Sequence, residues 1–402
     1  MIDLPKIETK RLAVKLTARA EKLVKQGHPW VFDNSIAKLN KEGQAGDLAI
    51  LFDNRADKVY GIALYDPDSP IRLKVLSSTP ATANEAFFKD KIQVAFKKRA
   101  KLLRTDTNSY RLLFGENDGF PGLIADVYDS VIVVKVYSAI WFPYLEMVLP
   151  HLLAISHTET MVLRLSRNVG KGNTYGLADG QVIHGVLKND VVTFVEHGVK
   201  FSANVIYGHK TGYFLDHRNN RKRVGELSRG KSVLDVFSYA GGFSVHALAG
   251  GAKEVVSLDI SAQALEVAVQ NGNLNPHKGT HKTMAIDAFV GLQQLIDEQQ
   301  QFDIVVIDPP SFAKSAREVP TARNSYARLA QLGAQLTKRN GLLVLASCSS
   351  RVEAQVFFDI CEAHIRKSNR TFNVEDKTYH DIDHPIGFPE GAYLKCGYYR
   401  LN

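Results

Sequence analysis

Residues 233–248 read VLDVFSYAGGFSVHAL, and this stretch decides the fold class. The apolar run around Asp235 predicts a buried strand, Gly241 and Gly242 allow a tight backbone approach, and the residues after them predict a helix. The free N–H groups and positive dipole end of that helix would suit the carboxylate of an amino-acid-like ligand. The stretch lacks the G-x-G-x-x-G order that admits a pyrophosphate, which argues against a dinucleotide-dependent oxidoreductase.

The same strand-and-helix rhythm continues toward the carboxyl end of the chain. Apolar runs at residues 253–260, 302–310 and 341–349 predict buried strands, and residues 261–274 and 326–339 predict helices between them. Alternation of this kind is typical of an α/β fold with a doubly wound, mostly parallel, Rossmann-like sheet. Ligands of such sheets lie beyond the carboxyl ends of the strands, so chemistry is expected at those ends.

Two smaller modules are expected ahead of this sheet. Residues 1–78 contain short β-branched runs separated by Gly, Asp and Pro, which predicts a compact β-barrel or sandwich. Residues 79–188 mix strands with helices and predict a central α+β domain, leaving 189–402 for the doubly wound domain. The basic stretch at 89–104 is best explained as a solvated helix face, with nucleic-acid contact as the alternative.

Composition narrows the class of protein. The 402 residues include 50 Lys and Arg against 42 Asp and Glu, a net charge of +8 that modestly favours a polyanionic partner. No apolar run approaches the roughly 20 residues of a membrane span, and the amino end lacks a signal-peptide core. We therefore expect a cytoplasmic protein with no membrane partner. Three unclustered cysteines argue against a disulfide framework and against a bound metal.

Acidic residues at three successive strand ends predict a pocket for S-adenosylmethionine. Asp235 and the paired glycines close the first strand, and Asp259 ends the second, where a carboxylate could accept hydrogen bonds from both ribose hydroxyls. Asp287 follows the third strand, placed either to reach an adenine amino group or to cap the next helix.

The fourth strand delivers IDPPSFAKS, residues 307–315. Asp308 emerges at the predicted ligand edge, and the two prolines after it stiffen the backbone against which a flat base could lie. Phe312 is a candidate to stack on a base and Lys314 to meet a phosphate, although both are also ordinary loop residues. As structure alone, Asp-Pro-Pro is a strand-terminating turn.

The three cysteines differ in their expected places. Cys361 lies in a predicted helix core and Cys396 in a late strand, whereas Cys348 follows the fifth strand, on the edge that carries the acids. A thiolate that adds to carbon 6 of a pyrimidine makes carbon 5 nucleophilic toward an electrophilic methyl group. Asp308 could hold the base through its ring nitrogen and amino group during this addition.

Several motifs together resemble, nearly end to end, the bacterial large-subunit ribosomal RNA cytosine-5 methyltransferases. They are GHPWVFDNSI (27–36), FGENDGFPGLIADVY (114–128), HKTGYFLDHRNNR (209–221), LDVFSYAGGFS (234–244), DPPSF (308–312), SCSS (347–350) and DHPIGFPEGAYLKCGYYRL (383–401). The resemblance implies an amino-terminal PUA domain, a central α/β insertion and a class I methyltransferase domain. It also implies S-adenosylmethionine as the methyl donor and large-subunit ribosomal RNA as the partner, and it leaves a homodimer open.

The resemblance also assigns roles to individual residues. Cys348 is the implied nucleophile, and Asp308, the residue expected to hold the base, is the second candidate catalytic residue. The implied S-adenosylmethionine pocket comprises Phe214, Asp216, Asp235, Phe237, Gly241, Gly242, Asp259, Asp287 and Asp308, with Arg218 helping to close it. The resemblance implies that the amino-terminal domain grips RNA. The candidate RNA contacts are Trp30 in that domain, Arg218 and Arg221 of a basic run, and the loop residues Phe312 and Lys314; a merely solvated charge run is an equal account of the arginines.

One departure from the family pattern keeps alternatives open. Many RNA cytosine-5 methyltransferases carry a second cysteine just after the Pro-Pro element, where this sequence has Ser311. Because the group that removes the carbon 5 proton is then unassigned, a guanine-nitrogen methyltransferase, which needs no thiol, stays the nearest alternative. A non-catalytic RNA-binding assembly factor is the alternative from another class, and a small-molecule methyltransferase has little use for the amino-terminal module.

Overall fold

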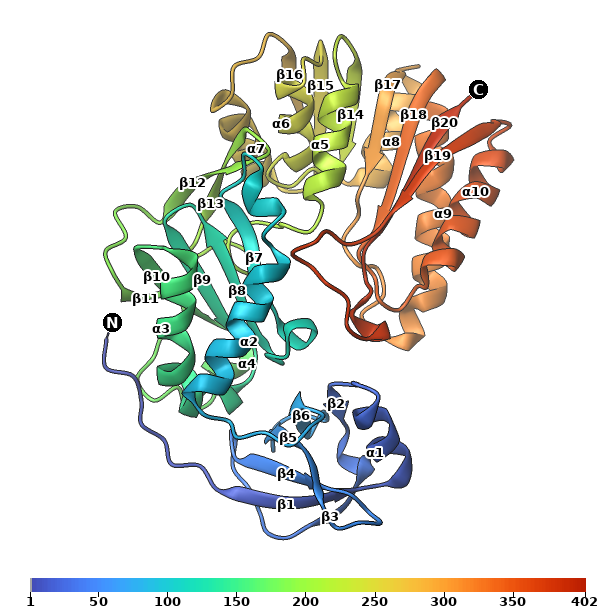
Figure 1. Ribbon diagram of the computed structural model, residues 1–402. Helices are drawn as coiled ribbons and strands as arrows, with labels where there is room; N and C mark the ends of the chain where they lie inside the picture. The colour runs from blue at the N-terminus through green and yellow to red at the C-terminus, as the bar shows by residue number, and fades with distance from the viewer. Residues whose placement is uncertain (1) are drawn as a thin grey trace. The chain divides into compact units, whose positions relative to one another are not determined.

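The computed structural model describes residues 2–402, and the chain divides into two compact units. Unit 1 comprises the chain up to Val195 together with Ala203–Leu215 and Ile382–Gly391. Unit 2 comprises Glu196–Ser202, Asp216–Asp381 and Ala392–Asn402. A short hairpin of β12 (Val191–Glu196) and β13 (Val199–Asn204) contributes residues to both units (Figure 1). The three-domain division at residues 78 and 188 stays a prediction.

Unit 1 contains two β-sheets. The first has the strand order β2-β6-β5-β4-β1-β3 and the second the order β11-β10-β9-β8-β7. The first sheet is built from β1 (Arg11–Leu16), β2 (Trp30–Val31), β3 (Ile36–Leu39), β4 (Leu48–Phe52), β5 (Val59–Tyr65) and β6 (Leu73–Ser77), with α1 (Ala18–Lys25). The second is built from β7 (Ser109–Phe114), β8 (Leu123–Tyr128), β9 (Val131–Val136), β10 (Thr160–Leu165) and β11 (Gln181–His184), with α2 (Glu85–Lys98), α3 (Leu145–Ser156) and α4 (Arg167–Gly170).

One segment of unit 1 corrects the expectation that no apolar run is long enough to span a membrane. Ala139–Ser156 is long and apolar enough by length and composition, and it is the one such segment among residues 2–402. In the structure it forms a 3₁₀ turn followed by α3, and Trp141, Leu145 and Leu149 are fully buried in the core of unit 1. Its apolar side chains are thus those of a core helix in a globular unit.

Unit 2 is a seven-stranded sheet with the order β16-β15-β14-β17-β18-β20-β19. The five strands from β16 to β18 pair in parallel, and β20 and β19 add to the edge in antiparallel fashion. The strands are β14 (Ser232–Val236), β15 (Glu254–Asp259), β16 (Thr280–Ala285), β17 (Phe302–Ile307), β18 (Thr337–Ser347), β19 (Phe372–Thr378) and β20 (Lys395–Leu401). This confirms the predicted doubly wound, mostly parallel α/β domain.

Helices cover both faces of this sheet (Figure 1). They are α5 (Arg218–Leu227), α6 (Gly242–Ala249), α7 (Ala262–Asn273), α8 (Ala288–Asp297), α9 (Val319–Leu336) and α10 (Ala354–Lys367). Apolar residues of α5 and α6 join one buried cluster, and residues of α8, α9 and α10 join another on the opposite face. Because both faces of the sheet are buried, the central strands are continuous apolar runs and do not alternate between apolar and polar residues. The positions of these strands could therefore be predicted from the sequence.

A buried ion-pair network holds the start of α5 in place. Glu196 accepts from Arg221 Nε at 2.7 Å and Nη2 at 2.6 Å, and from His246 Nε2 of α6 at 3.0 Å. Burial alone would raise the pKa of this carboxyl, but Arg221 and His246 hold the pKa of Glu196 below its usual range. Two helices beside the sheet are therefore tied to one carboxylate.

We predict that Glu196→Gln lowers the free energy of unfolding by about 3–5 kcal/mol, because it removes the buried carboxylate charge that forms the bidentate pair with the Arg221 guanidinium. Glu226→Gln, which breaks the exposed Lys222–Glu226 pair, is the matched control and should change it by less than about 1 kcal/mol. Denaturant unfolding of both variants measures the difference. Since the pKa of Glu196 is depressed in the folded state, its contribution is present above about pH 4.3 and is lost as the pH falls further.

Candidate functional site

The carboxyl ends of the parallel strands of unit 2 bring four predicted site residues to one edge of the sheet. Asp235 is the last residue but one of β14, Asp259 ends β15, Asp308 follows β17 and Cys348 follows β18. Parallel pairing places Asp235 opposite Val306 and Ile307 opposite Leu345, so these strands end together. The edge is where an open α/β sheet binds its ligand.

The turn after β14 has an unusual backbone. Phe237, Tyr239 and Gly241 all have positive φ values of 63°, 47° and 79°. A Cβ added at Gly241 would lie 2.8 Å from the Cβ of Ala268, so this glycine lets α6 approach α7 closely. The structure therefore gives Gly241 a packing reason in addition to the ligand contact that the sequence suggested. Gly242 begins α6, whose amino-terminal N–H groups lie at the ligand edge.

Asp235 carries the observation that best fits a bound ligand. Its side chain is 1% exposed, and its Oδ2 accepts from the backbone N–H of Ser244 at 2.9 Å and from the Ser244 hydroxyl at 2.7 Å. Its other oxygen, Oδ1, has no hydrogen-bond partner. Burial raises the pKa of Asp235 to about 7. A buried acceptor of this kind suits a ligand that brings its own N–H donors, such as the ammonium group of S-adenosylmethionine.

The other two acids of the predicted pocket already accept backbone hydrogen bonds. Asp259 accepts from the N–H of Tyr239 and of Ser261, both at 2.9 Å, and each of its oxygens keeps a lone pair for a ribose hydroxyl. Asp287 caps α8 by accepting from the N–H groups of Phe289 and Val290. Capping therefore accounts for Asp287, and its contact with adenine stays a prediction.

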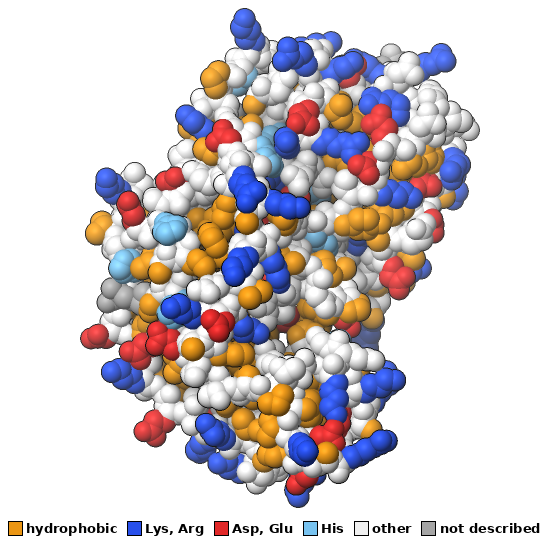
Figure 2. Space-filling model, in the orientation of Figure 1, with side chains coloured by type: hydrophobic (Ala, Val, Ile, Leu, Met, Phe, Trp, Pro, Cys, Tyr) orange, Lys and Arg blue, Asp and Glu red, His pale blue; other side chains and the backbone are white. Residues whose placement is uncertain are grey.

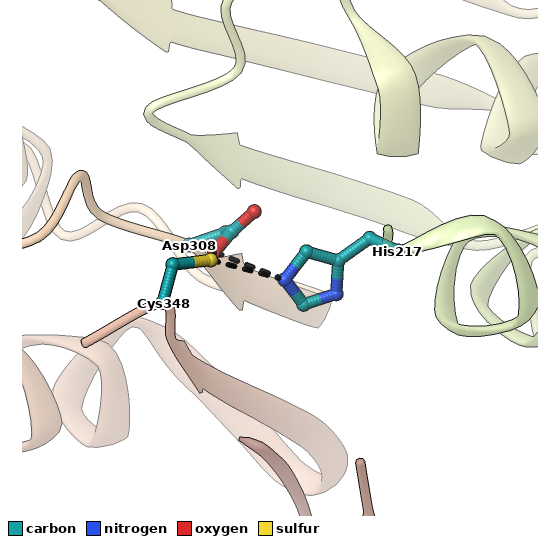
Figure 3. Close-up of side chains that lie close together, drawn as sticks. All are labelled: His217, Asp308 and Cys348. Carbon is teal, nitrogen blue, oxygen red and sulfur yellow. Dashed lines mark hydrogen bonds and ion pairs between the residues drawn. The ribbon is translucent and has the colours of Figure 1, made fainter. Parts of the chain in front are cut away.

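Three side chains from separate segments of unit 2 converge beyond β17 and β18 (Figure 3). Cys348 Sγ lies 3.7 Å from His217 Nε2 and 3.9 Å from Asp308 Oδ1. His217 Nε2 lies 3.3 Å from the same Asp308 oxygen. The strand-end pattern predicts that Cys348 and Asp308 share one edge of the sheet. It does not mark His217, although His217 lies within the motif HKTGYFLDHRNNR.

The same three residues are the one set of metal-capable side chains within 4.8 Å of one another among residues 2–402. Hydrogen bonds among them account for their spacing. We assign no metal to the set.

The three cysteines differ in solvent exposure. Cys361 in α10 is 1% exposed and Cys396 in β20 is fully buried, and burial raises the pKa of both thiols. Cys348 is half-buried at the strand-end edge. The predicted helix-core and late-strand positions of Cys361 and Cys396 are confirmed, and a nucleophile must be reachable, so Cys348 is the candidate.

The predicted phosphate contacts of Arg218 and Arg221 are not supported by the structure. Both side chains are buried, and the Arg221 guanidinium forms a bidentate pair with Glu196. Arg218 also lies near Glu196 and Asp381, at 3.9 Å from each. A buried, paired guanidinium has no access to an RNA backbone, so these two arginines stabilise α5 instead.

The remaining predicted site residues lie in varied surroundings. In unit 2, Asp216 is buried and accepts from the Tyr393 hydroxyl at 2.8 Å, Phe312 packs against Phe237 and Tyr326, and Lys314 is exposed. In unit 1, Phe214 lies under the Lys210 ammonium at 4.6 Å.

Trp30, also in unit 1, is half-buried between polar and aromatic partners. Its indole N–H donates to Glu116 at 3.2 Å, and its ring lies edge-on to Phe388 with 4.9 Å between centroids. These contacts hold the ring in place.

A doubly wound sheet with an acid-lined ligand edge and no pyrophosphate loop fits the class of S-adenosylmethionine-dependent methyltransferases. A family model of that description matches residues 184–367, and a PUA-like domain model matches residues 14–78. A structure described as a SAM-dependent methyltransferase from Streptococcus mutans has the same fold, with a TM-score of 0.81 at 21% identity over 96% of this chain and 99% of its own.

Sequence relatives then specify the family. A ribosomal RNA large subunit methyltransferase from Deinococcus radiodurans is 42% identical over 99% of this chain and 99% of its own length. A ribosomal RNA large subunit methyltransferase I from Vibrio parahaemolyticus is 34% identical over 95% of this chain and 98% of its own. The chain belongs to the family of large-subunit ribosomal RNA methyltransferases, and it depends on S-adenosylmethionine.

We predict that Asp259→Asn weakens binding of S-adenosylhomocysteine about 10- to 100-fold. The change removes the charge and one acceptor, and a hydrogen bond to a charged group contributes about 1.5–3 kcal/mol. Asp303→Asn is the matched control, since Asp303 lies at the amino end of β17, where it accepts from Ser232 and Lys338. Isothermal titration calorimetry compares them, and equal affinities for the two variants would contradict the assignment.

Proposed function

We propose that the protein methylates carbon 5 of a cytosine in large-subunit ribosomal RNA, with Cys348 as the nucleophile. The observation that carries this proposal is the position of Cys348. Of three cysteines, it alone is partly exposed, and it lies within 4 Å of both an acid and an imidazole at the ligand edge. A methyltransferase that modifies a nitrogen has no use for such a thiol, because its acceptor already carries a lone pair.

The residues of the chain can be given definite steps in this reaction. The sulfur lone pair of Cys348 forms a bond to carbon 6, and the displaced π electron pair makes carbon 5 nucleophilic. S-adenosylmethionine supplies the electrophilic methyl group, and the electron pair of the broken sulfonium–methyl bond stays on S-adenosylhomocysteine. The carbon 5 proton passes to solvent, and the electron pair of its bond restores the double bond as the sulfur–carbon 6 bond breaks. The electron pair of that sulfur–carbon bond returns to Cys348.

Asp308 is proposed to hold the base while the thiolate adds. Its Oδ1 lies 3.9 Å from Sγ and its side chain is half-buried, so the carboxylate borders the place where carbon 6 must sit. A carboxylate there accepts from the exocyclic amino group of a cytosine, and a proton shared between the carboxylate and ring nitrogen 3 offsets the negative charge that thiolate addition brings into the ring. Ser311, at the position of the family's second cysteine, donates to the carbonyl oxygen of Ala313 at 3.4 Å.

Ribosomal RNA as the substrate of this chain is inferred from the names of its relatives and supported by its PUA-like domain and charge. Figure 2 shows Lys and Arg side chains at many places on the visible face, interspersed with Asp and Glu. The net charge of +8 therefore does not mark a single RNA track by itself. Phe312, Lys314 and Trp30 are the proposed contacts, the cytoplasm is the proposed location, and a homodimer stays a prediction.

The decisive experiment is nucleoside analysis after incubation with labelled S-adenosylmethionine and undermethylated ribosomal RNA. We expect 5-methylcytidine from the wild-type protein and a loss of more than about 1,000-fold in Cys348→Ala, because removal of a nucleophile removes the covalent route. Cys361→Ala, in the core of α10, is the control and should keep the reaction. RNA containing 5-fluorocytosine should trap a covalent complex, because fluorine cannot leave as a proton.

Two other results would replace the proposal. Methylguanosine formed equally by Cys348→Ala would identify a guanine-nitrogen methyltransferase and make Cys348 structural. Tight RNA binding with no methyl transfer would indicate a non-catalytic assembly factor.

A separate experiment tests the proposed phosphate contact. We predict that Lys314→Ala weakens binding of a ribosomal RNA fragment and lowers the slope of log affinity against log salt by about one. Lys282→Ala is the matched control and should leave the slope unchanged. Lys282 is an exposed lysine of β16 that pairs with Glu254. Filter binding between about 50 and 200 mM salt, the range over which such contacts respond, measures both slopes. An unchanged slope in Lys314→Ala would remove this residue from the RNA surface.

A further inference from the structure

His217 has no role in the reaction as proposed above, yet it touches the reacting atom. Its imidazole is 2% exposed, and its Nε2 faces both Cys348 Sγ at 3.7 Å and Asp308 Oδ1 at 3.3 Å (Figure 3). It immediately precedes α5, so the helix start that the Glu196 network holds also fixes this ring.

The surroundings of His217 determine which ring nitrogen carries the proton. Asn220 Oδ1 accepts from the hydroxyls of Thr378 at 2.7 Å and Tyr398 at 2.9 Å. The amide nitrogen of Asn220 therefore faces His217 Nδ1, at 2.9 Å. An amide nitrogen only donates, so Nδ1 accepts and the proton of the neutral ring lies on Nε2, the atom directed at Sγ.

Several charged groups face this pair. Asp308 and Asp216 are the acids near the imidazole, and Arg221 is the cation. Burial lowers the pKa of His217, but the two acids more than offset this effect, so the pKa of His217 is raised overall. Near Cys348, the buried ammonium of Lys395 donates to the carbonyl oxygens of Ser349 and Val352, in the loop that follows the thiol.

The thiolate form of Cys348 needs a hydrogen-bond donor because the Asp308 carboxylate lies beside it. The Asp308 carboxylate lies within 4 Å of Sγ, and a like charge at that distance opposes ionisation of the thiol. An N–H group directed at the sulfur acts in the opposite sense, as a hydrogen bond to the charged form favours that form. His217 is the side chain that places one there.

On the basis of the function proposed above, we propose that His217 is a further catalytic residue, whose Nε2–H donates to Cys348 and stabilises its thiolate, and that Asn220 is a positioning residue that selects this tautomer. On ionisation the S–H bond breaks, its electron pair stays on sulfur and its proton leaves to solvent. The Nε2 proton stays on the ring. When the sulfur–carbon 6 bond breaks at the end of the cycle, the same N–H meets the returning thiolate.

The test is the rate of alkylation of Cys348 by iodoacetamide, measured as a function of pH with EDTA in the reaction. Mass spectrometry of the peptide that contains Cys348 reports the extent of alkylation. Cys361 and Cys396 are buried and serve as internal controls for a folded protein. His217→Gln places an amide N–H near the position of Nε2, whereas His217→Asn places its amide near Nδ1 and removes the N–H that His217 directs at the sulfur. The two variants therefore differ in the donor while disturbing the interior to a similar extent.

We expect the midpoint of the profile to rise by about one pH unit in His217→Asn, so that alkylation at pH 7 slows about tenfold, and to stay near wild type in His217→Gln. Identical profiles for all three proteins would overturn the proposal, and equal shifts in both variants would overturn the donor role of Nε2–H. The assay uses neither RNA nor S-adenosylmethionine. A methylguanosine product would therefore defeat the cytosine-5 proposal without changing this profile, and the two failures are distinguishable.

Discussion

The parallel register of β14, β17 and β18 is the constraint on which the rest of the site depends. Pairing of Asp235 with Val306 and of Ile307 with Leu345 makes the strands end together, so the residues just beyond them share one small volume. Asp308 and Cys348 are 40 positions apart in the chain and 3.9 Å apart in space for this reason. A one-residue slip of β18 would turn alternate side chains to the other face and separate the pair.

This constraint explains why the strand-end residues could be predicted from the sequence. Central parallel strands are buried on both faces, so each one is a continuous apolar run with a recognisable end. Asp235, Asp259, Asp308 and Cys348 could all be predicted because each lies at or just beyond the end of such a run. His217 was not found, because it precedes α5 and reaches the site from a segment that no strand pattern marks.

The environment of the basic run after His217 could not be predicted from the sequence. Arg218 and Arg221 lie three positions apart on a helix and therefore share a face, and that face is buried. Their partner, Glu196, comes from a different element more than 20 residues earlier, and local sequence carries no sign of such a pairing. A charge run is usually solvated, so the sequence favoured an RNA surface or an exposed face, and the tertiary ion pair overrode both.

Ionisation of the proposed nucleophile, Cys348, depends on opposing electrostatic effects of its neighbours. Two unit charges about 4 Å apart repel by about 4 kcal/mol at an effective dielectric constant near 20, which applies to a Cys348 thiolate beside Asp308. One hydrogen bond to a charged group returns only about 1.5–3 kcal/mol, so a donor from His217 alone leaves a deficit. The ammonium of Lys395 lies behind the loop that follows Cys348, and a cytosine that donates to Asp308 would offset part of the carboxylate charge. On the proposed mechanism, ionisation of the thiol is then most favourable when the base is in place, which couples nucleophile activation to substrate binding.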